Sequence, residues 1–413
     1  MIAYISLIAI VVAIAIGFWK NINVGLIALV FSLFIGFYLG GIPMDQIIGY
    51  WPLKLFFTTF GITLLFGIAK LNGTLEKISN TVIYHSGGKK VLIPIIFYFL
   101  AVIIASLGPG NISTSALLLP IGLIIAFQAN ISILLMSILI ILGSIAGGLS
   151  PLAPNGIVAL ELAKSTGVGD LGFHIYFNNV LAMTLFSGLT FIVLGGLKLK
   201  GERIEIKKVS KLDKIQVVTL ITILILVVWV MVGGVNVGFA AFALSAILLL
   251  FKAADQNLAI LSVPWSTILL ICGTAVLISV ADELGGVDLL TTFLASLMNE
   301  YTAVPILGVL AGVMSIFSSA VGVVMPTLIP TTVNLSNELG NVVSPAILTI
   351  TIAVASHIVT VSPLSTMGAL ALASSPEYVD KKKLFRDLFI AAFISLVFIA
   401  ILLWFMNALN LFL

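Results

Sequence analysis

The chain has 413 residues, of which 61% are hydrophobic and only 8% are charged, and its formal net charge is +3. Soluble domains carry about 25% charged residues, so this composition excludes a soluble globular protein. Long apolar runs recur from end to end, and about 20 helical residues span the hydrocarbon core of a bilayer. The runs lack the alternation of barrel strands, which leaves helices to satisfy the backbone groups in lipid. The sequence therefore predicts an all-α polytopic membrane protein with no nucleic-acid partner.

Ten segments are predicted to span the membrane. They lie near 2–19, 22–40, 54–72, 131–164, 174–197, 215–233, 236–252, 265–282, 344–374 and 385–411. Two further apolar runs, 91–128 and 303–335, contain a polar break near the middle, and we predict that they form re-entrant hairpins. The segments 73–86 and 285–300 have an amphipathic pattern. We expect them to lie along the membrane surface as arms of the hairpins.

Basic residues indicate how these segments are oriented. The stretch 196–214 contains seven Lys and Arg, and basic loops stay on the cytoplasmic side. Counting outward from it places 17 of the 19 Lys and Arg inside and only Lys54 and Lys164 outside. This count requires each broken run to enter and leave on the same side, as a hairpin does. We therefore expect a multi-pass protein of the inner (cytoplasmic) membrane with both termini outside.

The two halves of the chain resemble each other. The segment "LSPLAPNG" (149–156) corresponds to "VSPLSTMG" (361–368), while Gly61 falls on Gly273 and Pro120 on Pro330, at offsets of 210 to 212 residues. Each copy holds five spans, an odd number, so the second copy is predicted to be inverted. Inverted repeats with broken helices are typical of secondary transporters. The predicted repeats are 1–197 and 215–413, joined by a basic cytoplasmic linker, 198–214.

Four breaks rich in Gly, Pro and hydroxyl residues interrupt the apolar runs. They are Gly108–Thr114, Gly147–Gly156, Ser318–Gly322 and Thr360–Thr366. Backbone N–H groups freed at helix N-termini attract anions, and freed carbonyl and hydroxyl oxygens suit a small cation such as sodium. Symmetry predicts that the breaks meet at one site. The alternative for each break is a local kink whose Ser and Thr bond back to their own helix.

One ionisable residue, His357, is predicted to lie deep inside a span. Such residues are functional by default, and a histidine can titrate near neutral pH. The alternative is a neutral histidine hydrogen-bonded to a helix carbonyl. Both arginines, Arg203 and Arg386, lie in a loop or at a span end. An anion would therefore be held without a guanidinium group, which favours cotransport with cations.

The candidate site residues follow from the breaks. The predicted substrate-binding residues are Asn111, Ser113, Thr114, Ser150, Asn155, Ser318, Ser319, His357, Ser362, Ser365 and Thr366. The predicted cation-binding positions are Gly108, Gly110, Asn111, Gly148, Ser319, Ala320 and Thr360. No catalytic residue and no cofactor is predicted. The expected coupling ion is Na+, with H+ as the alternative.

The motifs "GPGNISTSALLLP" (108–120), "IAGGLSPLAPNG" (145–156) and "SSAVGVVMPTLIP" (318–330) resemble the ion transporter superfamily. The resemblance is strongest to divalent-anion:sodium symporters and MatC-type malonate/dicarboxylate carriers. In the symporters, a Ser-Asn-Thr signature at each hairpin tip helps to bind sodium and the substrate carboxylate, with its Asn nine residues before a proline. Asn111 has this spacing to Pro120.

Other positions match the family less evenly. At the second tip, Ala320, Val321 and Gly322 replace the whole signature, and Ser319 stands just upstream. Asn155 corresponds to the Pro-Asn ending of the family's unwound segment.

The resemblance implies a secondary active transporter for a small organic anion, such as malonate or a C4-dicarboxylate, coupled to sodium or protons. It also implies an elevator mechanism on a homodimer. The scaffold would comprise 1–53 and 215–264, and the transport parts 54–197 and 265–413 would carry the hairpins.

Other functions remain as alternatives. The chain could be the large membrane subunit of a TRAP-type carrier, which works with a soluble binding protein. A cation/proton antiporter of the same superfamily is less favoured, because no Asp or Glu is predicted deep in a span. An intramembrane hydrolase would need a serine beside His357, but no GxSG-type setting is present. ATP-driven transport lacks its GxxxxGK[ST] loop.

Overall fold

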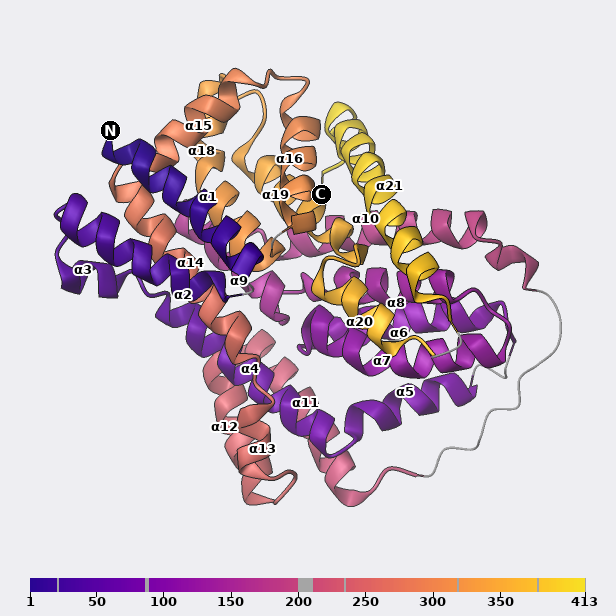
Figure 1. Cartoon of the computed structure of the whole chain (residues 1–413). Coiled ribbons are helices and arrows are strands. Elements are labelled where there is room, and N and C mark those ends of the chain that lie inside the picture. Colours follow the sequence, from indigo (N-terminus) through magenta and orange to yellow (C-terminus); the bar gives the residue numbers. More distant parts are fainter. Residues whose placement is uncertain are drawn as a thin grey trace.

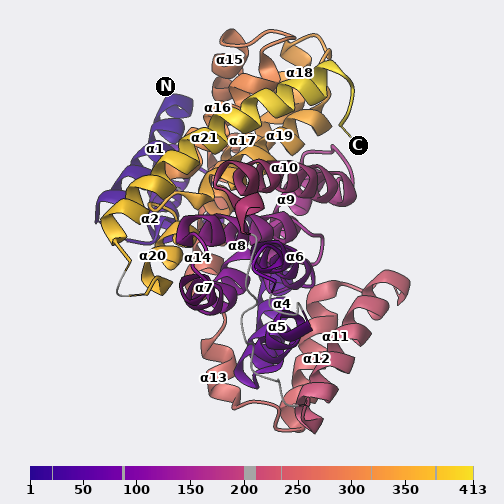
Figure 2. The ribbon, with the colours of Figure 1, turned by 90° about the vertical axis from the view of Figure 1, so that its right-hand side faces the viewer.

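The computed structural model describes residues 1–20, 22–85, 89–199, 211–233, 235–317, 319–376 and 379–412. Its regular elements are helices, and the described residues form no β-strand, as the sequence predicts. Part of the predicted linker, 200–210, lies outside the described residues. Figures 1 and 2 show that α15–α19 lie at one end of the molecule and α11–α13 at the other, with α6–α10 between them.

The first half of the chain contains ten α-helices, one π-helix and one short 3₁₀-helix among its described residues. They are α1 (Ile2–Lys20), α2 (Val24–Phe31) with the π-helix η1 (Ser32–Leu39), α3 (Met44–Gly49), α4 (Leu53–Leu71), α5 (Thr74–His85), α6 (Leu92–Ser106), α7 (Gly110–Gln128), α8 (Ile133–Gly148), α9 (Pro154–Ser165), α10 (Gly172–Val193) and η2 (Gly196–Lys198).

The second half repeats this order. Its described elements are α11 (Lys214–Gly233), α12 (Val237–Leu250), α13 (Gln256–Leu261), α14 (Trp265–Glu283), α15 (Gly286–Ser296), α16 (Ala303–Phe317), η3 (Ala320–Val324), α17 (Met325–Leu328), η4 (Ile329–Thr331), α18 (Thr332–Glu338), α19 (Pro345–Ile358), η5 (Val359–Val361), α20 (Thr366–Ser374) and α21 (Lys381–Ala408). From α1 and α11 onward, the α-helices of the two halves follow in the same order, with α7 matched by the path η3–α18, while η2 and η5 have no counterpart. The inversion of one copy relative to the membrane stays a prediction.

The predicted breaks appear as interruptions of helices. The run 91–128 is a pair of packed helices, α6 and α7, and 303–335 is α16 followed by the irregular helical path η3–α18. The run 131–164 is divided into α8 and α9, and 344–374 into α19 and α20. The six-residue helices α3 and α13 were not predicted, because a helix of that length leaves no periodic signal in the sequence. One hydrophobic cluster joins α6, α7 and α8 to α16, α19 and α21.

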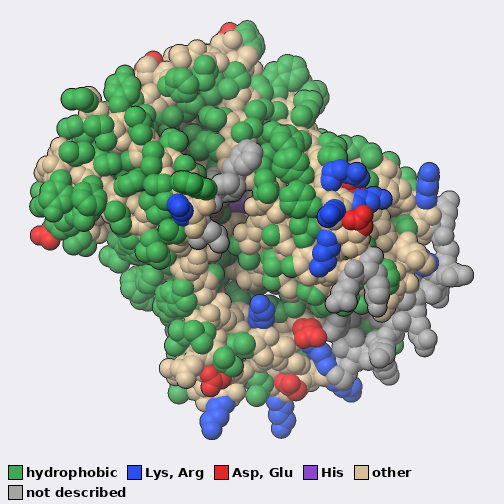
Figure 3. All heavy atoms as spheres, in the orientation of Figure 1, with side chains coloured by type: hydrophobic (Ala, Val, Ile, Leu, Met, Phe, Trp, Pro, Cys, Tyr) green, Lys and Arg blue, Asp and Glu red, His purple; other side chains and the backbone are tan. Residues whose placement is uncertain are grey.

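The helix lengths support a multi-pass arrangement. Among the described residues, five helical segments are long and apolar enough to cross a bilayer by length and composition: α7, α10, α14, Pro345–Ser374 and α21. Shorter apolar stretches of 10–17 residues lie in other helices, among them α1, α4, α6, α8 and α12. The hairpin arm α7 has 19 residues, so its length alone would also fit a span, and the re-entrant path stays a prediction. In Figure 3, hydrophobic side chains cover much of the visible face, while Lys and Arg gather towards its lower and right-hand parts.

The two halves pack against each other through matched glycines. Helix α4 packs against α12, and α14 packs against α2. A methyl group added at Gly61 on α4 would overlap the carbonyl oxygen of Gly238 on α12. A methyl group at Gly273 on α14 would overlap the carbonyl oxygen of Gly25 on α2 in the same way. The sequence match between Gly61 and Gly273 therefore marks two equivalent crossings at which backbones touch.

We predict that Gly61→Ala and Gly273→Ala each destabilise the protein, because backbone atoms cannot move aside as a side chain can. Overpacking of this kind costs about 1–3 kcal/mol. Thermal unfolding of the purified protein in detergent measures the effect. Gly188→Ala in α10 is the control, since nothing lies within 4 Å of its added methyl group. Equal unfolding midpoints for all three variants would show that the crossings are looser than described.

Candidate functional site

The first hairpin turns where α6 gives way to α7. Gly108 has a φ angle of +134°, a region closed to other residues, and a methyl group there would overlap the ring of Phe66. Pro109 precedes α7, whose first turn begins at Gly110. The side-chain oxygen of Asn111 accepts a hydrogen bond from the N–H of Ile112 at 2.9 Å. One of the N–H groups that a helix start leaves unpaired is thus satisfied.

The break between α8 and α9 is tied to this hairpin. The hydroxyl of Ser150 donates to the carbonyl oxygen of Ser106 at the end of α6, at 2.8 Å, and accepts from the N–H of Leu152 at 3.2 Å. A methyl group added at Gly148 would lie 3.0 Å from the Cβ of Asn111. Proline at the first position of α9 supplies a backbone angle suited to a helix start. Asn155 is therefore placed in the first turn of α9.

The second hairpin tip is held by two hydroxyl groups. Ser319 precedes the π-helix η3, and its hydroxyl accepts from the N–H of Gly322 at 3.0 Å. The hydroxyl of Thr274, on α14, donates to the carbonyl oxygen of Gly322 at 2.6 Å. These contacts fix the start of η3 against α14.

The break before α20 repeats the turn before α9. The hydroxyl of Ser362 accepts from the N–H of Leu364 at 3.3 Å, as Ser150 does with Leu152. The hydroxyl of Ser365 donates to the carbonyl oxygens of Ser362 and Thr360. The hydroxyl of Thr360 donates to the carbonyl oxygen of His357 at 2.7 Å.

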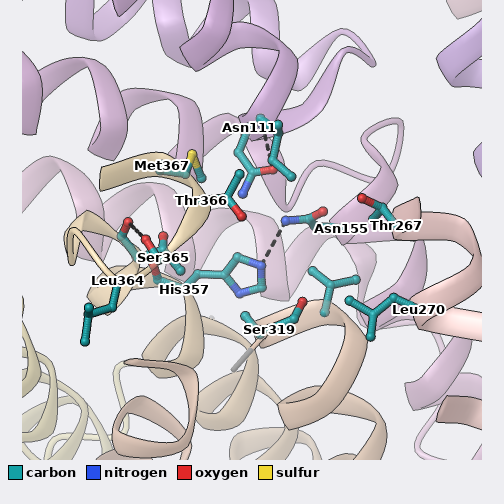
Figure 4. A pocket seen from close by; sticks show the side chains of 14 residues that line it. Asn111, Asn155, Thr267, Leu270, Ser319, His357, Leu364, Ser365, Thr366 and Met367 are labelled. Carbon is teal, nitrogen blue, oxygen red and sulfur yellow. Dashed lines mark hydrogen bonds between the residues drawn. The ribbon is translucent and has the colours of Figure 1, made fainter. Parts of the chain in front are cut away.

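All four breaks contribute to one cavity of about 280 Å³ (Figure 4). The described residues that line it are Asn111, Ile112, Asn155, Thr267, Leu270, Ser319, Ala320, Val321, His357, Thr360, Leu364, Ser365, Thr366 and Met367. Of the predicted site residues, the cavity brings together Asn111, Asn155, Ser319, Ala320, His357, Thr360, Ser365 and Thr366. Ser318 lies outside the described residues.

Seven predicted site residues do not line the cavity: Gly108, Gly110, Ser113, Thr114, Gly148, Ser150 and Ser362. Ser150 and Ser362 satisfy backbone groups of their own turns, and their predicted role in substrate binding stays a prediction. Thr114 is fully buried, and its hydroxyl has no hydrogen-bond partner within the described part of the chain. The glycines shape the backbone around the cavity instead of facing it.

Six lining residues were missed by the sequence analysis: Ile112, Thr267, Leu270, Val321, Leu364 and Met367. Thr267 and Leu270 belong to the unbroken helix α14, where no motif distinguishes one face from another. Met367 follows the break, and its sulfur accepts from the hydroxyl of Ser115 on α7 at 3.2 Å. This contact joins α20 to the first hairpin.

The electrostatics of the cavity come from helix ends. None of the described lining residues is Lys, Arg, Asp or Glu. Four helical segments, α7, α9, η3–α17 and α20, begin at the cavity, because residues of their first turns line it. A helix N-terminus carries about half a positive charge and unpaired N–H groups. The cavity therefore favours a small anion while it carries no fixed cationic side chain.

Both ring nitrogens of His357 are hydrogen-bonded within the protein. Nδ1 lies 2.7 Å from the carbonyl oxygen of Ala353, one helical turn earlier, and Nε2 lies 3.1 Å from the amide nitrogen of Asn155 (Figure 4). The ring is 1% exposed. It therefore matches the alternative of a neutral histidine bonded to a helix carbonyl. Both ring nitrogens have partners within the protein, and the predicted role of His357 in substrate binding stays a prediction.

Comparisons with known proteins show a carrier family and a transporter to which this chain is similar. Residues 1–148 match the family described as dicarboxylate carrier protein MatC N-terminus. The whole fold is similar to the crystal structure of the YdaH transporter from Alcanivorax borkumensis, with a TM-score of 0.60, 13% sequence identity and 88% of each chain covered. No curated protein matches the sequence. These findings confirm the predicted resemblance to MatC-type carriers and the prediction of a carrier in place of an enzyme.

We predict that Gly148→Ala weakens ligand binding more than it weakens folding, because its methyl group presses on Asn111. The expected loss is about 5-fold or more if one hydrogen bond of Asn111 is misaligned. Gly308→Ala is the matched control, since its nearest neighbour would lie at an ordinary 3.6 Å. Uptake and unfolding midpoint are measured for both variants. Full uptake by Gly148→Ala would mean that the position of Asn111 is not critical.

Proposed function

We propose that the protein is a secondary active transporter that moves a small dicarboxylate, such as malonate or a C4-dicarboxylate, across the cytoplasmic membrane. The observation that carries this proposal is the meeting of four helix N-termini at one cavity whose described lining residues include no charged side chain. Such an arrangement attracts a carboxylate yet releases it, because no guanidinium or ammonium group holds it. The family match to a dicarboxylate carrier and the transporter-like fold support the proposal.

The size of the cavity agrees with a small substrate. Pockets for drug-sized ligands measure about 300–1,000 Å³, and this cavity of about 280 Å³ lies just below that range. Its donors and acceptors come from Asn, Ser, Thr and backbone groups, which suit a carboxylate better than an apolar molecule. We infer that the two asparagines of the cavity bind the substrate.

Coupling to a cation follows from the same lack of fixed positive charge. A carboxylate in this cavity would be stabilised by a bound Na+, whose preferred ligands are oxygens. Ser319, Ala320 and Thr360, three of the predicted cation-binding positions, line the cavity. We propose that sodium binds among these oxygens and the backbone near Gly108, Gly110, Asn111 and Gly148. Protons are the alternative coupling ion.

We also propose an elevator movement on a homodimer. Apart from Thr267 and Leu270 on α14, the described lining residues in the proposed transport parts, 54–197 and 265–413, belong to the hairpins and the helices after them, which supports a site that moves with these elements. The glycine crossings bear on where the scaffold ends and the transport parts begin. At these crossings the backbone of α4 lies against that of α12, and the backbone of α14 lies against that of α2. Sliding is hindered at such contacts. We therefore propose that α4 and α14 remain with the scaffold, while the hairpins and the helices after them move.

The test is uptake of radiolabelled malonate and succinate into proteoliposomes, with sodium and proton gradients imposed separately. Wild-type protein should take up one of them when a gradient is present. Asn111→Ala should raise the KM by roughly 5- to 150-fold, because it removes one partner of a buried hydrogen bond. Asn334→Ala is the control: its amide bonds Asp288 at an exposed site away from the cavity.

Three results would count against the proposal or against the residues assigned to its site. Absence of uptake of either dicarboxylate under both gradients would remove the substrate class. Uptake only after addition of a soluble binding protein would favour the TRAP-type alternative. Equal KM values for Asn111→Ala and Asn334→Ala would remove Asn111 from the site.

A further inference from the structure

The amide of Asn155 is held in one orientation by His357. The carbonyl oxygen of Ala353 can only accept a hydrogen bond, so Nδ1 of His357, 2.7 Å away, carries the proton. In a neutral ring the other nitrogen, Nε2, is then an acceptor. Its partner at 3.1 Å is the amide of Asn155, which must donate through its nitrogen. The amide oxygen of Asn155 is thereby turned away from His357 (Figure 4).

The surroundings keep His357 neutral. An imidazolium would be stabilised by a nearby carboxylate, but the described residues that line the cavity from α7, α9, α14, η3 and α20 include no charged side chain and no second titratable group. The remaining neighbour of Nδ1 is the hydroxyl of Ser356 at 3.3 Å, which is neutral. Asn155 therefore presents an acceptor to the cavity, because its oxygen forms no hydrogen bond within the described part of the chain.

Asn111 has the opposite orientation. Its oxygen accepts from the N–H of Ile112, so its nitrogen, a donor, remains for the cavity. The two asparagines thus offer different groups to a ligand: Asn111 offers N–H, and Asn155 offers a carbonyl oxygen. Two carboxylates could not use both, because a carboxylate cannot donate to Asn155.

We propose that the cavity recognises a monoanion that pairs a carboxylate with a hydrogen-bond donor, namely a dicarboxylic acid with one carboxyl group ionised and the other protonated. The proposal rests on the proposed transport of dicarboxylates. The carboxylate accepts from Asn111 and the helix N-termini, and the protonated carboxyl donates its O–H to the oxygen of Asn155. His357 is a positioning residue that sets the amide of Asn155. The substrate then carries its own proton through the membrane.

The lack of charged side chains among the described lining residues agrees with a singly charged substrate. Taking a second negative charge out of water is costly where no side chain of opposite charge compensates it. A monoanion avoids that cost. A 2-hydroxy acid offers the same pairing of carboxylate and O–H, and pH dependence separates the two sources, because a hydroxyl stays protonated throughout the neutral range.

The test uses matched compounds on the wild-type protein. Malonamate and N-methylmalonamate have one carboxylate and an N–H donor, whereas monomethyl malonate has the size of the N-methyl amide but no donor. At pH 8, the N-methyl amide should inhibit malonate uptake with an inhibition constant about 10-fold or more below that of the ester. The same series built on succinate covers a four-carbon site.

A pH series provides a second readout. Above the second pKa of malonic acid, its singly protonated fraction falls about 10-fold per pH unit. The ratio of the KM for total malonate to the inhibition constant of malonamate should therefore rise about 10-fold per pH unit. Because malonamate stays a monoanion, the ratio cancels titration of the protein itself. Lactate and malate, tested in parallel, should show no such rise if a 2-hydroxy acid is the true ligand.

Two variants separate the asparagines. Asn155→Leu should reduce the advantage of the N-methyl amide over the ester to about 2-fold or less, since no acceptor remains. Asn111→Leu should weaken the binding of all compounds by a similar factor, because Asn111 contacts the carboxylate that they share. His357→Phe should act like Asn155→Leu, as the amide is then free to turn.

The inference is overturned if the ester and the N-methyl amide inhibit equally, or if the KM ratio stays constant with pH. It is also overturned if Asn155→Leu raises only the sodium concentration needed for half-maximal uptake, since Asn155 would then be a cation ligand. The compound series and the pH series are measured on the wild-type protein, so their results do not depend on whether the variants fold. If no compound of either series binds or is transported, the proposed function fails instead.

Discussion

A backbone N–H or C=O group that is freed inside an apolar interior must find a partner there, and four helix breaks in this chain free such groups together. Serine hydroxyls satisfy some of them: Ser150, Ser319 and Ser362 each accept from an N–H of their own turn. The first turns of the four following helical segments face one another across a shared cavity. The breaks therefore depend on one another, because the polar cavity that they share gives their freed backbone groups a polar environment.

This arrangement determines what the site offers to a ligand. Helix ends supply positive potential, and the described lining residues include no cationic side chain. His357 uses both ring nitrogens for contacts within the protein. Its effect reaches the cavity through Asn155, whose oxygen it turns outward. Asn111, at the tip of the first hairpin, presents its nitrogen because its oxygen serves the backbone. Two identical residue types thus become a donor and an acceptor through their neighbours.

Much of this plan could be predicted from the sequence, for a physical reason. Clusters of Gly, Pro and hydroxyl residues inside an apolar run favour the end of a helix, so all four breaks, with Asn111 and Asn155 among their residues, stood out. Which hydroxyl faces the cavity could not be predicted: Ser362 and Ser365 lie in one turn, yet only Ser365 lines the cavity. Thr267 and Leu270 were hidden because an unbroken helix gives no sign of the face it turns inward. The partners of His357 depend on packing between the two halves.

The central claim, that breaks from both halves surround one anion site, is tested most directly by ligand protection of single cysteines. With Cys272→Ser as background, Ile112→Cys and Leu364→Cys place thiols on two lining residues that are 37% and 43% exposed and come from different breaks. Malonate or succinate should slow maleimide labelling at both positions, and leave Leu261→Cys on α13, 72% exposed, unchanged. Protection of only one lining position, or of neither, would contradict a single shared site.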